Sequence, residues 1–526
     1  MIGLADFPVS TLLQSFAARQ GISRRSASPN RMHSESNGIE MPTLGALLGS
    51  AAIKTHSADA GKTVTCLITD SRRVVPGALF FAIKGNKANG NHYLEEAIDR
   101  GAVAIISEEA AGLRCPIAHY QVDDVRLTLA LVAKVFYNQP DEALKTTAIT
   151  GTNGKSTVAI LSQHLLGGRD QVGLLGTIRY DLGKRTLPSF RTTPESVDTF
   201  AMLDQMRRGG CQHAVFEASS HGLIQKRLYN IQCGVAAFLN LSQDHLDYHG
   251  TMEAYLAAKA CLFNGSNGSL PKHNVINCDD PWGQKILANI EDRTTVTTFG
   301  FAAEADIRAD NISLKATGTS FNLHCGEKVY PVTTHLPGRY NILNILAAFA
   351  IARAHGIEEV RIVERLQSLP QVPGRMERIS GSQPFSVFVD YAHTEDALAQ
   401  ALGMLREITT GRLLVVFGCG GNRDRGKRPL MAAAAEKTAD QLFITSDNPR
   451  SEAIETIFRE MRAGLQSPQK VAFISDRREA IAAAIAAAGP NDTILIAGKG
   501  HETYQEFADS VTPFDDRQVA RECLQE

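Results

Sequence analysis

Seven residues in the first third of the chain have the composition of a phosphate-binding loop. Residues 151–157 read GTNGKST, and they stand between an apolar segment, KTTAIT, and a segment with the pattern of a helix. Glycines allow the backbone to turn so that its N–H groups face phosphate oxygens, and a helix N-terminus adds a partial positive charge. In such a loop Lys155 would reach the β- and γ-phosphates and Ser156 would bind Mg²⁺. The general pattern has glycine where this chain has Ile149, so an ordinary strand–turn–helix corner is the alternative.

Two strand-like segments that follow the loop end in residues suited to a divalent metal. HAVFE ends at Glu217, and VAAFLN is followed by LSQDHLDYHG, which contains His245. Because the carboxyl ends of parallel strands meet at one edge of a sheet, we expect both side chains in one crevice. Phosphoryl transfer needs a metal ion and positive charge around the γ-phosphate. The alternatives are a solvated glutamate and a histidine in a cap or turn.

Charged side chains also follow three strand-like segments in the last third of the chain. LLVVF precedes Arg423, QLFIT precedes Asp447, Asn448 and Arg450, and TILI precedes Glu502. The carboxylates can take an ammonium, and the guanidinium groups can fork onto a carboxylate. We therefore expect these side chains to bind one end of a ligand, an end that carries both an ammonium and a carboxylate group. The alternative is a proline-containing turn with its charges in water.

The pattern of strands and helices that must position these residues indicates an α/β protein. We expect three domains, because 526 residues exceed what one hydrophobic core supports. Residues 41–142 predict a small α/β domain, with strands at 63–70, 77–83 and 103–108 and a helix at 93–100. Residues 143–371 predict a parallel sheet, with strands at 145–150, 172–175, 214–217 and 234–240, an antiparallel annex at about 295–335 and a helix at 341–355. Residues 372–526 predict a doubly wound, Rossmann-like domain, with strands at 386–390, 413–417, 441–445, 471–474 and 493–497.

The composition of the chain limits which classes of binding partner and which cellular compartment we expect. The chain has 44% hydrophobic residues, 21% charged residues and a formal charge of −2, so we expect neither nucleic acid nor a membrane as a partner. Nine cysteines without a CxxC pair favour a reducing cytosol and argue against disulfides or a zinc site. The sequence has no uninterrupted apolar run long enough to span a bilayer. Residues 1–40, which include SRRSAS, are interpreted as a flexible extension, with an organelle transit peptide as the alternative.

The string TGTNGKST resembles the shortened ATP loop of the Mur ligase family, and the similarity extends over about residues 65–510. The resemblance implies an ATP-dependent amide-bond ligase of bacterial peptidoglycan synthesis in the cytoplasm, with ATP and Mg²⁺ as cofactors, and we expect a monomer. The implied ATP contacts are Gly151, Thr152, Asn153, Gly154, Lys155, Ser156, Thr157, Asn341 and Arg375. The implied metal ligands are Ser156, Glu217, His245 and Lys259, and the implied catalytic residues are Lys155, Glu217, His245 and Lys259. Lys259 would be carbamylated, although composition alone places this lysine on the surface.

Resemblance also implies the first substrate. TDSRRVVPGALFFAIKG is similar to the UDP-binding segment of the members that add the third residue of the peptide stem. This similarity implies a uridine-diphosphate contact for Ser71, and a helix-capping Asp-Ser pair is the alternative. The positions that match contacts to the UDP-linked muramoyl dipeptide are Thr192, Thr193, Ser219, Gln225 and Arg227. Arg191 stands where relatives often have asparagine.

The last domain would select the incoming amino acid. The implied contacts to meso-diaminopimelate are Arg423, Asp447, Asn448, Pro449, Arg450, Gly498 and Glu502. Lysine lacks the far carboxylate and would leave a buried arginine unpaired, so Arg450 argues against a lysine-adding member. The implied reaction passes through an acyl phosphate on the D-Glu γ-carboxylate, which the amine attacks to displace phosphate. The remaining alternatives are folylpolyglutamate synthetase, which is not expected to carry TDSRR or DNPR, and a non-catalytic nucleotide-binding regulator.

Overall fold

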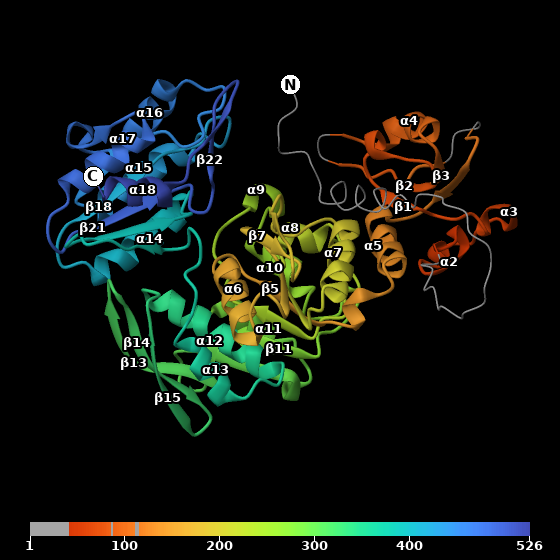
Figure 1. Ribbon diagram of the computed structural model, residues 1–526, viewed down its shortest axis with the longest axis horizontal. Coiled ribbons are helices and arrows are strands. Elements are labelled where there is room, and N and C mark those ends of the chain that lie inside the picture. The colour runs from red at the N-terminus through yellow and green to blue at the C-terminus, as the bar shows by residue number, and fades with distance from the viewer. Residues whose placement is uncertain (1–40, 86–87, 111–114, 526) are drawn as a thin grey trace, which may run out of the picture. The chain divides into compact units, whose positions relative to one another are not determined.

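The computed structural model describes residues 41–85, 88–110 and 115–525, so the extension predicted at residues 1–40 lies outside the described residues (Figure 1). The described chain forms two compact units. The first comprises residues up to 155, 166–276 and 280–296, and the second comprises 156–165, 277–279 and 297 onwards. Among the described residues, no helix is both long and apolar enough to cross a lipid bilayer.

The first unit begins with helix α2 (Leu44–Gly49) and a small parallel sheet. Its strands are β1 (Cys66–Ile68), β2 (Ala78–Phe81), β3 (Ala102–Ser107) and β4 (Ala118–Gln121), paired in that order. Helix α4 (Leu94–Asp99) precedes β3, and α5 (Val125–Phe136) follows β4. The carboxylate of Asp124 accepts the Leu127 N–H at 2.8 Å, which satisfies one unpaired donor at the start of α5. The three predicted strands are confirmed, whereas β4, which is only partly buried, lies outside the prediction.

The larger sheet of the first unit holds β5 (Lys145–Thr150) between β9 (His213–Glu217) and β10 (Val235–Phe238). The order in this unit is β11-β10-β5-β9-β6-β7-β8, with β6 at Val172–Leu175, β7 at Arg179–Asp181, β8 at Thr186–Pro188 and β11 at His273–Asn277. The four predicted strands, β5, β6, β9 and β10, run parallel as expected. β11 lies outside the prediction and is also parallel, whereas β7 and β8 are antiparallel. After β5 the chain builds β6 and β9 on one side and then β10 on the other. The carboxyl end of β5 therefore lies where ligands of open α/β sheets bind.

Helices connect these strands and bring polar side chains to the same sheet edge. They are α6 (Lys155–Leu166), α7 (Ser196–Arg208), α8 (Ser220–Ile224), α9 (Leu246–His249), α10 (Met252–Ala260) and α11 (Pro281–Ala288). α6 and α8 follow closely on the carboxyl ends of β5 and β9, and α9 is the first helix after β10. The loops before these helices therefore leave the sheet at its carboxyl edge.

The second unit contains the predicted annex, which is confirmed. β13 (Ile307–Lys315), β14 (Gly318–Cys325) and β15 (Lys328–Thr334) are antiparallel, and β12 (Val296–Gly300) pairs in parallel with β13. Buried and partly exposed residues alternate along most of β14, and buried and exposed residues alternate at the end of β15, as expected for a sheet with one solvated face. The long apolar helix α12 (Arg339–Ala354) and the shorter α13 (Glu359–Leu366) follow.

The C-terminal α/β domain of the second unit is doubly wound, as predicted. Its sheet has the order β16-β17-β21-β18-β19-β20, with bounds Glu377–Ile379, Ser386–Asp390, Thr493–Ala497, Leu413–Phe417, Gln441–Ile444 and Ala472–Phe473. All are parallel except β16. The helices are α14 (Glu395–Ile408), α15 (Lys427–Thr438), α16 (Ile454–Arg462), α17 (Arg477–Ala487) and α18 (Asp516–Cys523). A small hairpin, β22 (Tyr504–Glu506) and β23 (Val511–Pro513), lies between β21 and α18.

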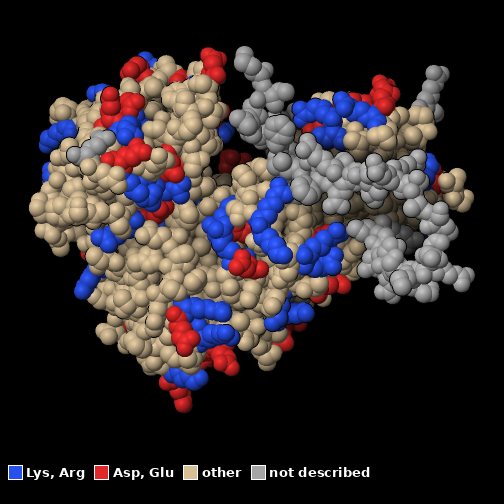
Figure 2. All heavy atoms as spheres, in the orientation of Figure 1, with Lys and Arg blue, Asp and Glu red and all other residues tan. Residues whose placement is uncertain are grey.

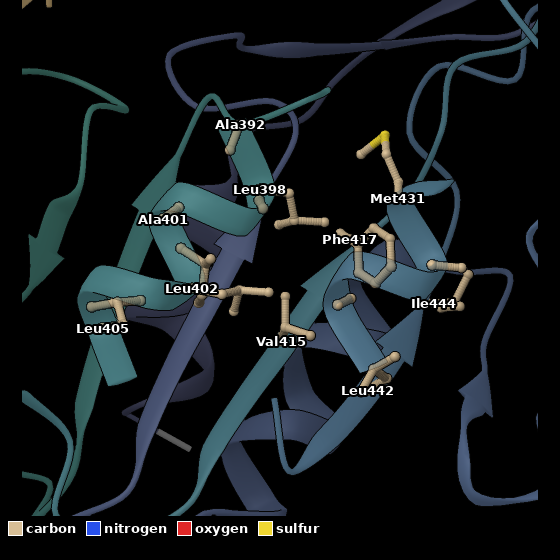
Figure 3. Close-up of a cluster of buried hydrophobic side chains, with 14 of the residues drawn as sticks. Ala392, Leu398, Ala401, Leu402, Leu405, Val415, Phe417, Met431, Leu442 and Ile444 are labelled. Carbon is tan, nitrogen blue, oxygen red and sulfur yellow. The ribbon is translucent and has the colours of Figure 1, made fainter. Parts of the chain in front are cut away.

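Alternate residues of β18 pack against helices on opposite faces of this sheet. Val415 and Phe417 belong to a core formed with α14, α15 and α16, whereas Leu414 and Val416 belong to a core formed with α17 and α18. In Figure 3, Leu398 and Leu402 of α14 lie close to Val415 and Phe417. Each fully buried side chain of this size contributes roughly 1.5–3 kcal/mol relative to exposure. This two-sided core fixes the strand ends that carry the polar loops.

The surface of this domain is mixed in charge. On the face that Figure 2 shows, acidic and basic side chains are interspersed among a larger area of uncharged residues. This agrees with a formal charge of −2 for the whole chain.

Candidate active site

The predicted phosphate loop follows β5 and is tied to the end of β10. The Thr152 N–H donates to the carbonyl of Asn240 at 3.0 Å, and the Asn153 N–H donates to Oδ1 of the same residue at 2.9 Å. The amide of Asn240 returns a hydrogen bond to the Asn153 carbonyl at 3.1 Å. Gly154 has a φ of +87°, a backbone conformation that side chains other than hydrogen disfavour. Asn240 is therefore a scaffold residue of the loop, and it lies outside the sequence prediction because its partners are distant along the chain.

Two lysines converge on the carbonyl of Gly151. Lys155 Nζ donates to the carbonyls of Gly151 and Thr152 at 2.9 and 2.8 Å, and Lys259 Nζ donates to the Gly151 carbonyl at 2.9 Å. Lys259 is 1% exposed, so the surface position that composition predicts for it is wrong. Its ammonium also lies 4.5 Å from the ring centroid of Tyr255. Burial, followed by the charge of Lys155, holds the pKa of Lys259 well below its usual value, and Asp244 opposes this shift.

Glu217 is buried at the end of β9 and is held by a threonine from the neighbouring strand end. It is 2% exposed, so the solvated alternative is wrong. Its carboxylate accepts the Thr177 N–H at 2.8 Å and the Thr177 hydroxyl at 3.1 Å. Thr177 follows β6, and its hydroxyl lies 2.9 Å from that of Thr192. The sequence signal for Thr177 is weak, since it is one small polar residue after an apolar strand.

His245 lies immediately before α9 with a φ of +52°, which is the turn position that is the alternative interpretation of this residue, and its role as a metal ligand stays a prediction. Its imidazole makes no capping hydrogen bond; it lies 3.4 Å from Asp244 and has its ring centroid 4.9 Å from that of His221. His249 is bonded to the Ser220 hydroxyl at 2.9 Å and stacks on Tyr255 with centroids 4.8 Å apart. Imidazoles and Tyr255 thus gather at the ends of β9 and β10, beside Lys259.

The residues predicted to contact the dipeptide form a connected network with Glu217. The Thr193 hydroxyl donates to the Glu217 carbonyl at 2.7 Å and lies 2.9 Å from the hydroxyl of Ser219, which caps α8. Arg227 donates to the Thr193 carbonyl at 2.9 Å and to Oε1 of Gln225 at 2.6 Å. With Thr192 joined through Thr177, all five residues and Glu217 lie within one set of hydrogen bonds.

One carboxylate outside the prediction serves this network. Glu195 precedes α7 and lies 3.1 Å from Arg227, and it also pairs with Arg191, the residue that stands where asparagine is common in relatives. Burial lowers the pKa of Arg227, and Glu195 opposes the shift. The charge of Arg227 is therefore kept in an interior position by a neighbouring carboxylate.

Ser71 lies in the small N-terminal sheet region and is buried. Its hydroxyl donates to Oε2 of Glu96 at 2.6 Å. Asp70, not Ser71, caps the short helix that follows, because its carboxylate accepts the Arg72 N–H at 3.1 Å. The capping alternative is thus confirmed for Asp70, and the Ser71 hydroxyl has a separate partner.

Resemblance implies nucleotide contacts for Asn341 of α12 and for Arg375, which precedes β16. Asn341 donates to the Pro337 carbonyl at 2.8 Å and accepts from the Asn344 amide at 3.1 Å, so these residues share one buried helix face. The guanidinium of Arg375 lies over the ring of Tyr391, 4.8 Å from its centroid. Burial raises the pKa of the neighbouring Asp390, and Arg375 opposes that shift.

The residues predicted to bind the amino acid lie at the ends of β18, β19 and β21, which are neighbours in the order β21-β18-β19. A Cβ added to Gly420 would lie 3.3 Å from Nη1 of Arg450 and 3.7 Å from Cγ of the exposed Arg423, so both arginines border this glycine. Gly498 has a φ of +111°, and a Cβ there would lie 2.9 Å from Oδ2 of Asp447. The three strand ends therefore present both signs of charge at one edge.

Protein groups that the sequence did not reveal already contact these side chains. Arg450 donates through Nε to Glu506 at 2.8 Å and through Nη1 to the carbonyl of Gly421 at 2.8 Å. The Asn448 amide donates to Oε2 of Glu502 at 3.1 Å. The buried Lys499 donates to the same oxygen at 3.1 Å. Pro449 leaves little room beside the loop, since a Cβ at Gly421 would lie 1.9 Å from the Pro449 carbonyl oxygen.

Comparison with protein families accounts for nearly all of the described chain. Residues 63–149 match the model described as "Mur ligase family, catalytic domain", residues 149–352 match "Mur ligase middle domain", and residues 374–500 match "Mur ligase, glutamate ligase domain". The chain belongs to the Mur ligase family. The resemblance expected from TGTNGKST is thereby confirmed.

Two curated relatives and one solved structure share a name. The UDP-N-acetylmuramoyl-L-alanyl-D-glutamate--2,6-diaminopimelate ligase of Solibacter usitatus is 42% identical over 485 residues, 91% of this chain and 98% of that protein. The ligase of the same name from Geobacillus thermodenitrificans is 42% identical over 469 residues, 88% of this chain and 95% of its own. A solved structure with this name has 34% identity, a TM-score of 0.67, and covers 91% of this chain and 98% of that chain.

A more distant structure shares the fold alone. MurF ligase from Thermotoga maritima, solved in complex with ADP, has 19% identity and a TM-score of 0.56, and the match covers 87% of this chain and 96% of that chain. The three-domain architecture predicted from the sequence is the architecture of these ligases.

Proposed function

We propose that this chain is an ATP-dependent ligase that joins meso-diaminopimelate to the D-Glu of UDP-N-acetylmuramoyl-L-alanyl-D-glutamate in bacterial peptidoglycan synthesis. The observation that carries the choice of amino acid is that Arg423 and Arg450 border Gly420 at the sheet edge that also presents Asp447. An amino acid whose far end bears a carboxylate and an ammonium satisfies both signs of charge. Relatives that carry this name over most of their length support the same substrate.

ATP would bind with its phosphates on residues 151–157. The tight backbone at Gly154 and the start of α6 offer N–H groups to the phosphates, and the Lys155 ammonium lies at the loop to meet their charge. Thr152, Asn153 and Thr157 complete the loop. Asn341 and Arg375 are proposed as further nucleotide contacts by resemblance, with Arg375 held on the ring of Tyr391.

Mg²⁺ fits the residues gathered at the ends of β9 and β10. Among the described residues, no three His, Cys, Asp or Glu side chains are grouped to hold a metal ion by themselves. That suits a hard cation that takes much of its coordination from phosphates and water. We assign Ser156, Glu217, His245 and a carbamylated Lys259 as its protein ligands. When bound, the ion neutralises charge on the phosphates.

The environment of Lys259 supports the proposed carbamylation. Burial lowers the pKa of this lysine and so favours its neutral amine, and only a neutral amine nitrogen can bond to the carbon of CO₂, with release of a proton. The product is an anionic oxygen ligand in place of a desolvated cation. It would also relieve the proximity of two ammonium groups on the Gly151 carbonyl.

The residues of this chain then position and stabilise the reacting groups. An oxygen of the D-Glu γ-carboxylate attacks the γ-phosphorus of ATP and ADP leaves, which gives an acyl phosphate. The amine nitrogen of diaminopimelate attacks the acyl carbon, phosphate leaves and the nitrogen loses a proton. Lys155 stabilises charge on the transferred group, and Arg227 with Gln225, Thr192, Thr193 and Ser219 would orient the dipeptide. Ser71 is proposed to contact the uridine diphosphate.

The proposal extends to the organisation of the chain. The substrate domain is residues 41–142, the catalytic domain is residues 143–371, and the amino-acid domain is residues 372–526. We take the protein to act as a monomer in the bacterial cytoplasm, where UDP-linked precursors and ATP are both available.

The test is phosphate release from ATP in the presence of the UDP-muramoyl dipeptide and either meso-diaminopimelate or L-lysine. We expect turnover with diaminopimelate and a product whose mass equals that of the tripeptide. If the protein prefers L-lysine, the diaminopimelate assignment is wrong and the chain is a lysine-adding ligase. Absence of turnover with either amino acid, in protein that still binds ATP, would favour a nucleotide-binding regulator.

A further inference from the structure

Lys499 is a fully buried cation at the centre of the amino-acid site. It follows β21 between Gly498 and Gly500, and its side chain is 0% exposed. Nζ donates to Oδ1 of Asn448 and to Oε2 of Glu502, both at 3.1 Å, and lies 3.9 Å from Oδ1 of Asp447. The Tyr504 ring covers it at 5.5 Å from the centroid. A buried ammonium is costly unless carboxylates surround it, and these partners meet that requirement.

The formal charges of Lys499 and the two carboxylates beside it sum to one negative charge. Asp447 and Glu502 together carry two negative charges, and Lys499 balances one of them. The other buried cation beside these acids, Arg477, is already matched by Asp516, and Arg450 is matched by Glu506. One negative charge is what a single substrate ammonium would neutralise. Arg423 then remains for the substrate carboxylate.

We infer that Lys499 is a positioning and specificity-determining residue, which sets the charge of the amino-acid site to accept one ammonium at the far end of the substrate. This inference rests on the proposed function and deepens it. Lys499 acts through Glu502 and Asn448, whose side chains it orients, and it need not touch the amino acid. Without its charge the site would carry two carboxylates against one ammonium, and the surplus carboxylate would oppose the substrate's own carboxylate.

The experiment begins with the wild-type protein and three amino acids. Meso-diaminopimelate has both far-end groups, L-lysine has the ammonium alone, and L-2-aminopimelate has the carboxylate alone. The wild-type preference tests the proposed function by itself. Variants of Lys499 are then measured with whichever amino acid the wild type prefers, so failure of the substrate assignment leaves the test of Lys499 intact.

The principal variant is Lys499→Met, which keeps an unbranched side chain, shorter by one atom, and removes its charge. We expect KM for the amino acid to rise about 30-fold or more, with kcat within about threefold and KM for ATP within about twofold. Lys437→Met, at an exposed position of α15 in the same domain, is the matched control and should leave all three constants unchanged. An unchanged amino-acid KM in Lys499→Met, or an equal rise in KM for ATP, would overturn the inference.

A double variant separates charge from packing. Lys499→Met combined with Glu502→Gln leaves one carboxylate, Asp447, and so restores a single negative charge. We expect its amino-acid KM to lie below that of Lys499→Met alone, although two groups are lost. If the two effects multiply instead, Lys499 acts by packing and the charge argument fails.

Glu502→Gln alone keeps the inference testable if Lys499→Met does not fold. In this variant Lys499 and Asp447 cancel, so the preference for an amino acid with a far ammonium should disappear. The ratio of kcat/KM for diaminopimelate to that for 2-aminopimelate is expected to fall about tenfold or more. If the charge of Lys499 did not count, Asp447 by itself would keep that ratio, and retention of the ratio would overturn the inference.

Discussion

Arg477 and Asp516 form an ion pair in which both side chains are fully buried. Nε and Nη2 of the arginine each donate to one carboxylate oxygen at 2.7 Å. The same guanidinium donates to the carbonyls of Ser446 and Ala497 at 3.2 and 2.9 Å. These carbonyls belong to the residues just before Asp447 and Gly498. The start of the last helix, α18, is thereby fastened beneath the amino-acid site.

Removal of one member of this pair should destabilise the C-terminal domain. Asp516→Asn or Arg477→Met leaves a buried charge without its partner, at a cost of about 3–5 kcal/mol in the free energy of unfolding. The double variant Arg477→Met/Asp516→Leu should be less destabilised than either single one, because no uncompensated charge remains. Urea unfolding followed by amide exchange in β19 and β21 measures both. Additive losses in the double variant would mean that the pair contributes little as a pair.

Arg450→Ala should impair use of diaminopimelate and spare ATP. The guanidinium pairs with Glu506 and borders Gly420, so its loss leaves the Glu506 carboxylate without this partner beside the pocket, where its charge opposes the substrate carboxylate. We expect KM for diaminopimelate to rise about 100-fold and the Kd for ATP to change by less than about twofold. Arg459→Ala, at an exposed position of α16, is the control. An equal loss of affinity for diaminopimelate and for ATP would argue against the assigned pocket.

Lys259→Met should abolish turnover without loss of stability. The variant removes a desolvated charge from a position that is 1% exposed, so the melting temperature should stay the same or rise. Loss of the proposed anionic ligand should lower kcat about 100-fold or more. Lys285→Met, an exposed lysine on α11, serves as the comparison. Normal turnover by Lys259→Met would exclude the lysine from the metal site.

His213 should make the first unit sensitive to mild acid. Burial, with a contribution from Lys145, lowers the pKa of this histidine from 6.5 to about 4 in the folded protein. The unfolded chain therefore binds more protons between these values, so stability falls as pH drops from 6.5 towards 4. The expected loss at pH 5 relative to pH 7.5 is about 1–2 kcal/mol from this group. His213→Gln should show a correspondingly flatter pH dependence of amide exchange in β9; an identical pH dependence would contradict the assignment.

The sequence predicts those parts of the fold that local pattern determines. Buried parallel strands are continuous apolar runs, and for Leu413–Phe417 the bounds match the prediction residue for residue. Other strands, such as β10 and β20, are shorter than predicted. β7 and β8 span three residues each and carry no comparable run, so only pairing with β6 defines them. Local pattern also places Glu217 and Asp447 at strand ends, where the structure has them.

The partners of the site residues could not be predicted in this way. Thr177 holds Glu217 from 40 positions away, and Glu506 holds Arg450 from 56 positions away. Lys259 reads as a surface residue because helical position alone does not show which face will be covered. Such contacts depend on which strand ends become neighbours, and that order is a property of the whole sheet.

The central place of β21 has a consequence for synthesis of the protein. This strand is the last of the parallel strands to leave the ribosome, yet it pairs between β17 and β18, which are made much earlier. Until β21 has been synthesised, β17 and β18 each have an unpaired edge and exposed apolar faces. A chain in this state is prone to self-association. A chain truncated before residue 493 would therefore contain the complete nucleotide loop but a last domain without its central strand. We expect such a product to be degraded by proteases and to have no partial activity.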